Sequence, residues 1–304
     1  MSVLFVIGAG ASYGNPDCEP HPPPLGARLY SELKVESQVA RELDEEVVKI
    51  LETGDFESGM ELLWEREPVK ITPLQIDLAK YFTKFKAGSD NYYNQLIKII
   101  KKSKKKPVIS TTNYDLLLEQ CINDNGYYIT YGGLPVELDN ISLLKIHGSC
   151  NFLPDMKPDQ IQGIGFVVPK EGGGILKANI KPASADESRS FCERSDSIAP
   201  AIAVYSKGKQ VLHCGDFVKE TQEQWAKEVD RASKIFVIGL RVVEHDRHIW
   251  DKLSGCNTWL GYVGLKKDCT DFLSWAETHG RKNAFALANS FEESLPVIER
   301  RLKS

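Results

Sequence analysis

The sequence predicts an α/β fold with a doubly wound, parallel sheet that is interrupted by a helical insertion. Three observations favour this fold class. A short apolar run near the N-terminus, Val3–Ile7, leads directly into a glycine-rich turn. Two later apolar runs, Pro107–Ser110 and Leu143–Ile146, each lead into polar residues. In the last third of the chain, strand-like and helix-like patterns alternate, which is typical of a parallel sheet covered on both faces.

The composition is that of an ordinary globular protein. Of the 304 residues, 42% are hydrophobic and 26% are charged, which excludes the collagen-like, disordered and disulfide-scaffold classes. The 38 Lys and Arg residues nearly balance the 42 Asp and Glu residues, giving a net charge of -4. This balance provides no global attraction for nucleic acid or for an anionic membrane.

The seven cysteines are an odd number, and no two of them are separated by only two residues. This usage indicates reduced thiols and disfavours a four-cysteine zinc site. The N-terminal run lacks a preceding basic region and reaches glycines too soon for a signal peptide. No stretch approaches the roughly 20 apolar residues that span a bilayer. We therefore expect a cytoplasmic protein.

The first third of the chain predicts one strand and then helices. Val3–Ile7 has the apolar, β-branched composition of a buried parallel strand. Asn15–Pro24 contains five prolines, so we expect no helix to begin before about Leu25. Amphipathic spacing predicts a helical insertion at about 25–102, with runs at Leu25–Leu33, Val39–Leu51, Phe56–Trp64, Leu74–Phe85 and Tyr92–Ile100.

The remaining chain predicts the rest of the sheet. A helix to about Asn123 separates the strands Pro107–Ser110 and Leu143–Ile146. The segment at about 151–199 has little periodicity and predicts an irregular loop or small subdomain, with one possible strand at Gly163–Pro169. Strands and helices then alternate at Lys234–Ile238, Asp246–Leu253, Thr258–Val263, Thr270–His279, Asn283–Ala288 and Phe291–Leu302. The predicted core of this single domain, 1–304, is thus about 1–24, 103–150 and 200–304.

The glycine-rich turn is Gly8-Ala9-Gly10-Ala11-Ser12-Tyr13-Gly14. Glycines directly after a strand permit a sharp turn and a close approach of the backbone to a pyrophosphate. The third glycine stands one position late, and no second strand ending in an acidic residue follows about twenty residues on. A standard dehydrogenase is therefore disfavoured. A glycine turn that only closes the strand is the alternative interpretation.

Asn113 and His147 each stand just beyond the C-terminal end of an apolar strand, the edge at which open parallel sheets bind ligands. An Asn amide donates and accepts at once and can hold a water or a ribose hydroxyl, while a His can accept a proton near neutral pH. Each residue alone is explained by a turn cap or a satisfied loop histidine. Together with the glycine turn, they favour a functional site.

Four segments, in this order, resemble the prokaryotic sirtuin-like (SIR2-like) domains that consume NAD in antiviral defence. They are the glycine turn after Val3–Ile7, Thr111-Thr112-Asn113-Tyr114-Asp115, Leu143–Ser149 and Ile235–Trp250. The resemblance spans roughly residues 3–302 and implies a Rossmann-like sheet. It implies catalytic roles for Asn113 and His147, and NAD-binding roles for Gly8, Ala9, Gly10, Ser12, Asp115, Gly239 and Asp246. Among these, it places Gly239 and Asp246 in the later strand-to-helix turn on the adenosine side.

The activity implied by this resemblance is NAD+ hydrolysis to ADP-ribose and nicotinamide, with NAD depletion serving bacterial anti-phage defence. The transition state has oxocarbenium character, and nicotinamide is already a good cationic leaving group, so two aligned carboxylates are unnecessary. The protein has to fix the ribose and position water. One alternative is a catalytically silent NAD- or ADP-ribose-binding regulatory subunit. Another is a protein deacylase or ADP-ribosyltransferase, although the paired cysteines of the deacylases' zinc module are missing.

NAD is the expected substrate, and we expect no metal, because His245 and His248 lack a third ligand in visible spacing. The predicted elements leave little room for a built-in sensor. We therefore expect control by homo-oligomerisation or by a defence-system partner protein, such as an ATPase or helicase, a short Argonaute or a nucleotide-metabolising protein. Direct binding to nucleic acid or to a membrane is not expected.

Overall fold

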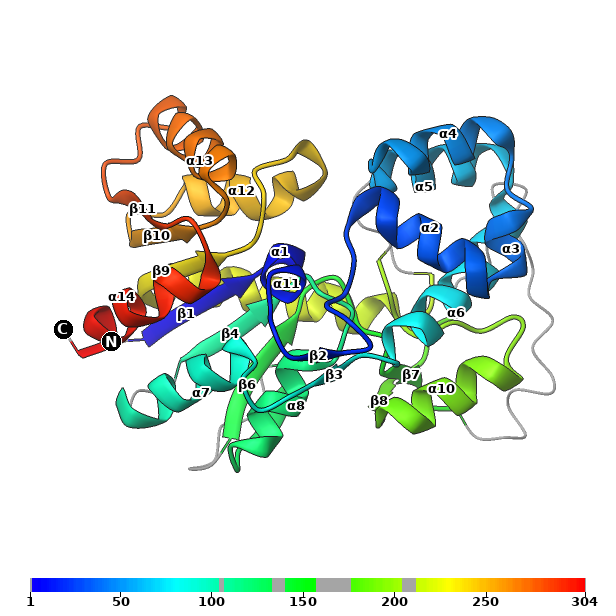
Figure 1. Cartoon of the computed structure of the whole chain (residues 1–304), viewed down its shortest axis with the longest axis horizontal. Coiled ribbons are helices and arrows are strands. Elements are labelled where there is room, and N and C mark those ends of the chain that lie inside the picture. The colour runs from blue at the N-terminus through cyan, green and yellow to red at the C-terminus, as the bar shows by residue number, and fades with distance from the viewer. Residues whose placement is uncertain (1, 104–106, 133–139, 157–175, 204–211, 304) are drawn as a thin grey trace.

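The structure is a computed structural model. It describes residues 2–103, 107–132, 140–156, 176–203 and 212–303. Its centre is a sheet of seven strands in the order β11-β10-β9-β1-β4-β6-β5 (Figure 1). Every pairing in this sheet is parallel. The strands are β1 (Ser2–Ile7), β4 (Val108–Thr111), β5 (Tyr128–Tyr131), β6 (Asn140–Lys145), β9 (Ala232–Ile238), β10 (Trp259–Val263) and β11 (Ala284–Ala288).

Strand β1 shows why the sheet needs helices on both faces. Val3, Phe5 and Ile7 pack into one apolar cluster with residues of α7 (Tyr92–Ser103), α8 (Leu117–Asp124) and α14 (Phe291–Lys303). The alternate residues of β1, Leu4 and Val6, pack into a second cluster with α11 (Gly215–Arg231), α12 (Arg247–Ser254) and α13 (Lys266–Thr278). The predicted doubly wound α/β sheet is therefore confirmed.

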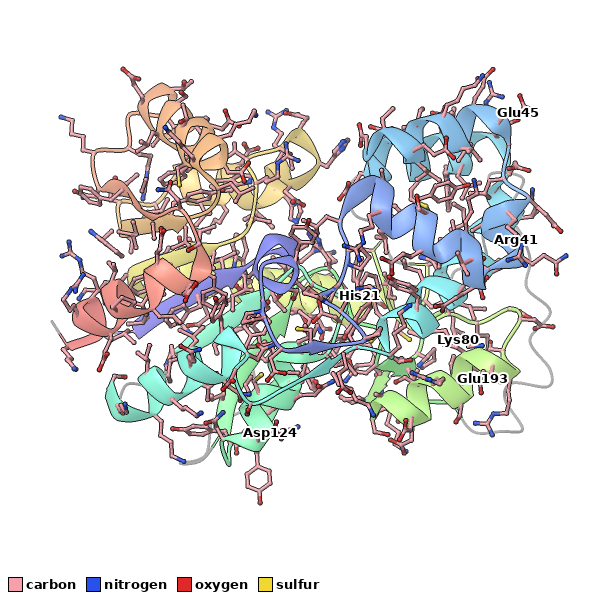
Figure 2. The ribbon with its side chains drawn as sticks, viewed as in Figure 1. His21, Arg41, Glu45, Lys80, Asp124 and Glu193 are labelled. Carbon is pink, nitrogen blue, oxygen red and sulfur yellow. The ribbon has the colours of Figure 1, made fainter. Side chains whose placement is uncertain are left out.

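The helices after the first strand do not all lie together. In Figure 1, α2 (Gly26–Glu36), α3 (Gln38–Arg41), α4 (Glu45–Thr53) and α5 (Phe56–Arg66) stand apart from the sheet. By contrast, α7 packs on α8 and α14. Helix α6 (Ile71–Phe82) packs against α10 (Ala185–Arg194), and Figure 2 labels Lys80 and Glu193, whose 3.5 Å ion pair joins the two helices. The division into core and insertions stays a prediction.

Several elements differ from the sequence expectation. Helix α1 (Ala9–Tyr13) lies within the glycine-rich segment itself and ends before the prolines, so the expectation that no helix begins before about Leu25 is wrong. The segment at about 151–199 contains α10 and a strand pair, β7 (Phe152–Pro154) with β8 (Ile180–Pro182), while Gly163–Pro169 lies outside the described residues. Strand β5 and helix α11 were not predicted. The first third of the chain also contains a 3-10 turn, η1 (Pro68–Lys70), and a short antiparallel pair, β2 (Cys18–Glu19) with β3 (Lys86–Ala87).

The described residues also show the state of the cysteines and the character of the helices. All seven cysteines are free thiols. None of the described helices combines the length and the apolar character needed to cross a membrane.

We predict that His213 makes the protein less stable in acid. Its side chain is buried, and desolvation lowers its pKa from 6.5 to about 4. Between these values the unfolded chain binds a proton that the folded chain excludes, so stability falls by about 3 kcal/mol as the pH decreases through this window. Urea denaturation at a series of pH values measures the effect. His213→Gln should flatten this part of the profile, whereas His279→Gln, a change at an exposed histidine, should not.

Candidate functional site

The candidate site lies along the carboxyl edge of four adjacent strands, β9, β1, β4 and β6. One row of the sheet pairs Ile238 with Ile7, Ile7 with Thr111, and Thr111 with Lys145. The polar segments begin one or two residues beyond this row. Sheet order reverses around β1, because β4 lies on one side of it and β9 on the other. Such a reversal is where open α/β sheets bind ligands.

The glycine turn packs directly on the turn after β9. The Gly10 N–H donates to the Gly239 carbonyl oxygen at 2.9 Å. A Cβ atom on Gly8 would lie 2.5 Å from that same oxygen, and one on Gly239, whose φ is +66°, would lie 2.2 Å from the Ala11 nitrogen. The glycines therefore have a packing reason that is independent of any ligand.

A buried hydrogen-bond cluster joins the glycine turn to the end of β4. Asn113 Nδ2 donates to Ser12 Oγ at 2.9 Å and approaches the Tyr93 hydroxyl at 3.3 Å, and the Ser12 and Tyr93 hydroxyls lie 2.9 Å apart. The Asn113 backbone N–H donates to Thr111 Oγ1. Burial raises the pKa of Tyr93 well above its usual range, so its hydroxyl stays protonated. The amide is thus held from its nitrogen side.

The other end of the Asn113 amide is different. Asn113 is 6% exposed, and its Oδ1 atom is buried and has no hydrogen-bond partner among the described residues. A buried acceptor that is left unpaired costs about 1–3 kcal/mol, and most such atoms in native proteins are paired. The amide therefore presents an oxygen that a water or a ligand hydroxyl can satisfy.

Asp115 lies two residues further on, just ahead of the first residue of α8, Leu117. Its Oδ1 accepts the Leu117 N–H at 3.1 Å. Burial raises the pKa of Asp115, while Lys145, the Leu117 N–H and the Ser12 side chain oppose that rise. The Lys145 ammonium donates to the Asp115 carbonyl oxygen at 2.7 Å and to Glu119 Oε1 at 2.6 Å. Asp115 is thus tied to the site through this buried lysine.

His147 lies in a second cluster, with residues that follow β9. His147 Nε2 is 3.1 Å from His248 Nε2 and 3.6 Å from Asp246 Oδ1. Asp246 ends the 3-10 turn η2 (Glu244–Asp246), and His248 lies in the first turn of α12. The His147 ring is 4% exposed, whereas His248 is exposed. Two imidazoles and a carboxylate from segments about a hundred residues apart thus converge on one point.

We predict that the turn after His147 tolerates only glycine. Gly148 has φ +79°, and a Cβ atom there would lie 1.9 Å from the Ala201 carbonyl oxygen. Gly126 is a matched control, because its φ is +81° and a Cβ there meets nothing within 4 Å. Gly126→Ala should cost about 1–2 kcal/mol of unfolding free energy. Gly148→Ala should cost clearly more in the same denaturation assay, and equal losses would contradict this packing argument.

The contacts among the predicted site residues form three groups. Gly8 and Gly10 meet Gly239; Ser12 meets Asn113; and His147 meets Asp246. Ala9 is the first residue of α1. The Asp246 carboxylate faces the His147 ring, and the place on the adenosine side that the resemblance implies for Asp246 stays a prediction. The assignment of functional roles to these residues stays a prediction.

Sequence reasoning missed three contributors. Tyr93 is on α7 and showed only helical periodicity; its hydroxyl contacts both Ser12 and Asn113. Lys145 lies in an apolar strand, where a lone lysine was itself a signal of a buried partner. For His248, the sequence showed no third metal ligand at a visible spacing. The structure instead gathers His147, Asp246 and His248, with ligand atoms all within 4.8 Å of one another.

His245, the other histidine of that motif, is not in this group. Its Nε2 faces Asp55 Oδ1 at 3.4 Å and Ser58 Oγ at 3.5 Å, both on the helical segment before β3. Within the described part of the chain, His147, Asp246 and His248 form the one group of three or more side chains suited to hold a metal ion. It contains no cysteine.

Solved structures similar to this chain include ones described as Sir2 enzymes and Sir2 homologues. One, described as "Structural Basis for the Mechanism and Regulation of Sir2 Enzymes", has a TM-score of 0.50 and 15% identity, covering 99% of this chain and 92% of that chain. A Sir2 homologue in complex with NAD has a TM-score of 0.46 and 12% identity, with 99% and 89% covered. No protein-family model matches the sequence, and no curated protein matches it. The chain thus has a sirtuin-like, Rossmann-like fold.

Proposed function

We propose that this protein is an NAD+ hydrolase that releases nicotinamide and ADP-ribose at the carboxyl edge of β1, β4 and β6. The resemblance in the four strand-end segments supports this proposal, as does the sirtuin-like fold. The observation that carries it is the Asn113 amide. Its nitrogen is fixed by Ser12 and Tyr93 while its buried oxygen has no partner among the described residues. Such an acceptor fits a ribose hydroxyl or the attacking water.

The reaction needs little acid–base chemistry from the protein. The water oxygen bonds to the anomeric carbon of the ribose while the bond to the nicotinamide nitrogen breaks, and its electron pair leaves with nicotinamide. The water proton passes to His147 or to solvent, so NAD+ and water yield ADP-ribose, nicotinamide and a proton. Asn113 orients water and ribose, and His147 acts as base or as partner of a ribose hydroxyl. The tight turn formed by Gly8, Gly10 and Gly239 lets the backbone approach the NAD phosphates closely.

Two other functions would use the same crevice. A catalytically silent NAD- or ADP-ribose-binding subunit would not need both Asn113 and His147. A deacylase or ADP-ribosyltransferase would replace water by an acyl-peptide or a protein side chain. The described group of possible metal ligands holds no cysteine, which gives the deacylase's zinc module no support. We therefore favour hydrolysis, and we propose that it requires no metal.

The biological role that we propose is NAD depletion as a cytoplasmic effector of bacterial anti-phage defence. It rests on the resemblance in the four segments. Its activator would be self-association or a partner encoded nearby, such as an ATPase or helicase, a short Argonaute or a nucleotide-metabolising protein.

Incubation of the purified chain with NAD, alone and with the products of its neighbouring genes, tests the proposed activity. Chromatography of the products should show ADP-ribose and nicotinamide in equal amounts. NAD that stays intact under every condition, yet binds, would favour the silent subunit. Nicotinamide release that requires an acyl-peptide or a protein acceptor would favour the transferase class.

We predict that dilute, isolated protein is only weakly active. An unrestrained NAD hydrolase would poison its own cell. A single coupling of about 1–3 kcal/mol changes the competent population by only about 5–150-fold, so strong repression requires several interfaces. Specific activity should therefore rise with protein concentration or with a partner. Full activity of a dilute monomer, unchanged by any partner, would contradict this control by assembly.

A further inference from the structure

The second cluster of the site has the composition of a metal centre. One ring nitrogen of His147, one of His248 and an oxygen of Asp246 all lie within 4.8 Å of one another. Two imidazoles and one carboxylate are a common ligand set for zinc, which binds His nitrogens and Asp oxygens and keeps a fourth position for water. None of these ligands is a thiolate, so the site differs in kind from a structural site made of paired cysteines.

The two separations measured from His147 Nε2 fit one small ion. Two metal–ligand bonds of about 2.1 Å that meet near the tetrahedral angle place their ligand atoms about 3.4 Å apart. The observed separations from His147 Nε2 are 3.1 Å to His248 Nε2 and 3.6 Å to Asp246 Oδ1, on either side of that value. His248 is an exposed residue, whereas His147 and Asp246 are buried, so the cluster lies between the surface and the interior.

We propose that His147, Asp246 and His248 bind a divalent transition-metal ion of the zinc type, and that the bound ion inhibits NAD cleavage. The inhibitory effect, unlike the metal binding, rests on the proposed function of His147. A metal on His147 Nε2 occupies the lone pair with which that nitrogen would accept a proton. The ion also places positive charge beside a reaction centre that itself becomes cationic, which destabilises the transition state. The enzyme is thus active without metal and is blocked with it.

Equilibrium dialysis against Zn2+, without NAD, tests the binding. Wild-type protein should bind one ion per chain. His248→Ala and Asp246→Asn should each weaken binding by at least about 100-fold, because even the loss of an outer partner costs 10–100-fold. His245→Ala is the matched control, since His245 lies in the same motif but faces Asp55, and it should bind as wild type does. Circular dichroism and thermal melting identify any variant that fails to fold. If either His248→Ala or Asp246→Asn fails to fold, the binding measured for the other one decides whether the site exists.

Absorption spectra of the Co2+-bound protein and NAD-cleavage assays with Zn2+ complete the test. Bound Co2+ should give visible ligand-field bands without thiolate charge transfer. Zn2+ should inhibit NAD cleavage by wild type and by His245→Ala, and a chelator should restore the cleavage. No stoichiometric binding, binding unaffected by His248→Ala, or a thiolate band would overturn the site, while binding without inhibition would overturn the inhibitory role. If no variant cleaves NAD under any condition, the proposed function fails, yet the dialysis result still decides the metal site.

Discussion

Asn113→Ala and His147→Ala should each reduce NAD cleavage by at least about 100-fold while leaving the fold largely intact, because misplacement of the reacting groups alone can cost about 10²-fold. Loss of groups that act mainly in the transition state lowers turnover more than it lowers ground-state affinity. NAD binding should therefore survive both changes. Initial rates of nicotinamide release, together with NAD titrations and thermal melting, measure the three quantities separately.

Matched controls separate this effect from damage to the fold. Asn123→Ala replaces an exposed asparagine of α8, and His279→Gln replaces an exposed histidine after α13. Both should retain wild-type rates. Tyr93→Phe is more informative, because it removes the hydroxyl that contacts Ser12 and Asn113 but keeps the ring. An intermediate loss of turnover would agree with a positioning role for Tyr93. Wild-type turnover in both Asn113→Ala and His147→Ala would mean that the site is elsewhere.

Among substitutions next to the candidate site, Lys145→Ala should cause the largest loss in the free energy of unfolding. The Lys145 side chain is 0% exposed and Glu119 is 7% exposed, with 2.6 Å between Nζ and Oε1. Burial raises the pKa of Glu119 and the lysine opposes that rise. Removing one partner of a buried pair typically costs about 3–5 kcal/mol, because the other is left uncompensated. Urea denaturation should show this loss.

Two comparisons make the result specific to the buried pair. Lys145→Met combined with Glu119→Leu replaces both charges by apolar groups of similar volume, and should recover most of the stability. Lys267→Ala breaks the exposed Lys267–Asp271 pair of α13 and should change stability by less than about 1 kcal/mol. If Lys145→Ala were as mild as Lys267→Ala, the buried pair would not stabilise the site edge in the way we describe.

The sheet could be predicted because its signals are local. Val3–Ile7 is a continuous apolar run, and a strand that is buried on both faces needs this composition. The strand–helix alternation after β9 is equally visible, and its boundaries differ by only a few residues from those observed. Helix α10 also had a local signal that was not used, since Ser184 and Glu187 form a capping box.

Other elements had weak or misleading signals. Helix α11 is different, because its buried residues recur at helical spacing and gave a signal that was not used; they are Val218, Thr221, Trp225 and Val229. Strand β5 is at the sheet edge and exposes Tyr128. The prolines of Asn15–Pro24 restrict their own backbone and the residues just before them, and α1 ends ahead of them at Tyr13.

The candidate site was predictable only in part, for a related reason. Asn113 and His147 stand at strand ends, and parallel strands bring their carboxyl ends to one edge whatever lies between them. The approach of His248 to His147 spans 101 residues, and that of Tyr93 to Ser12 spans 81. Such contacts depend on how α7 and α12 pack on opposite faces of the sheet. No spacing in the sequence contains that information.

The most direct test of the central claim is a single reaction in water labelled with heavy oxygen. The chain, at the concentration or with the partner that gives full activity, is mixed with NAD, and the products are weighed by mass spectrometry. We predict one labelled oxygen in every ADP-ribose, an equal amount of nicotinamide, and loss of both products in Asn113→Ala. Product release without the label, or labelled ADP-ribose that Asn113→Ala still makes at the wild-type rate, would contradict hydrolysis at this sheet edge.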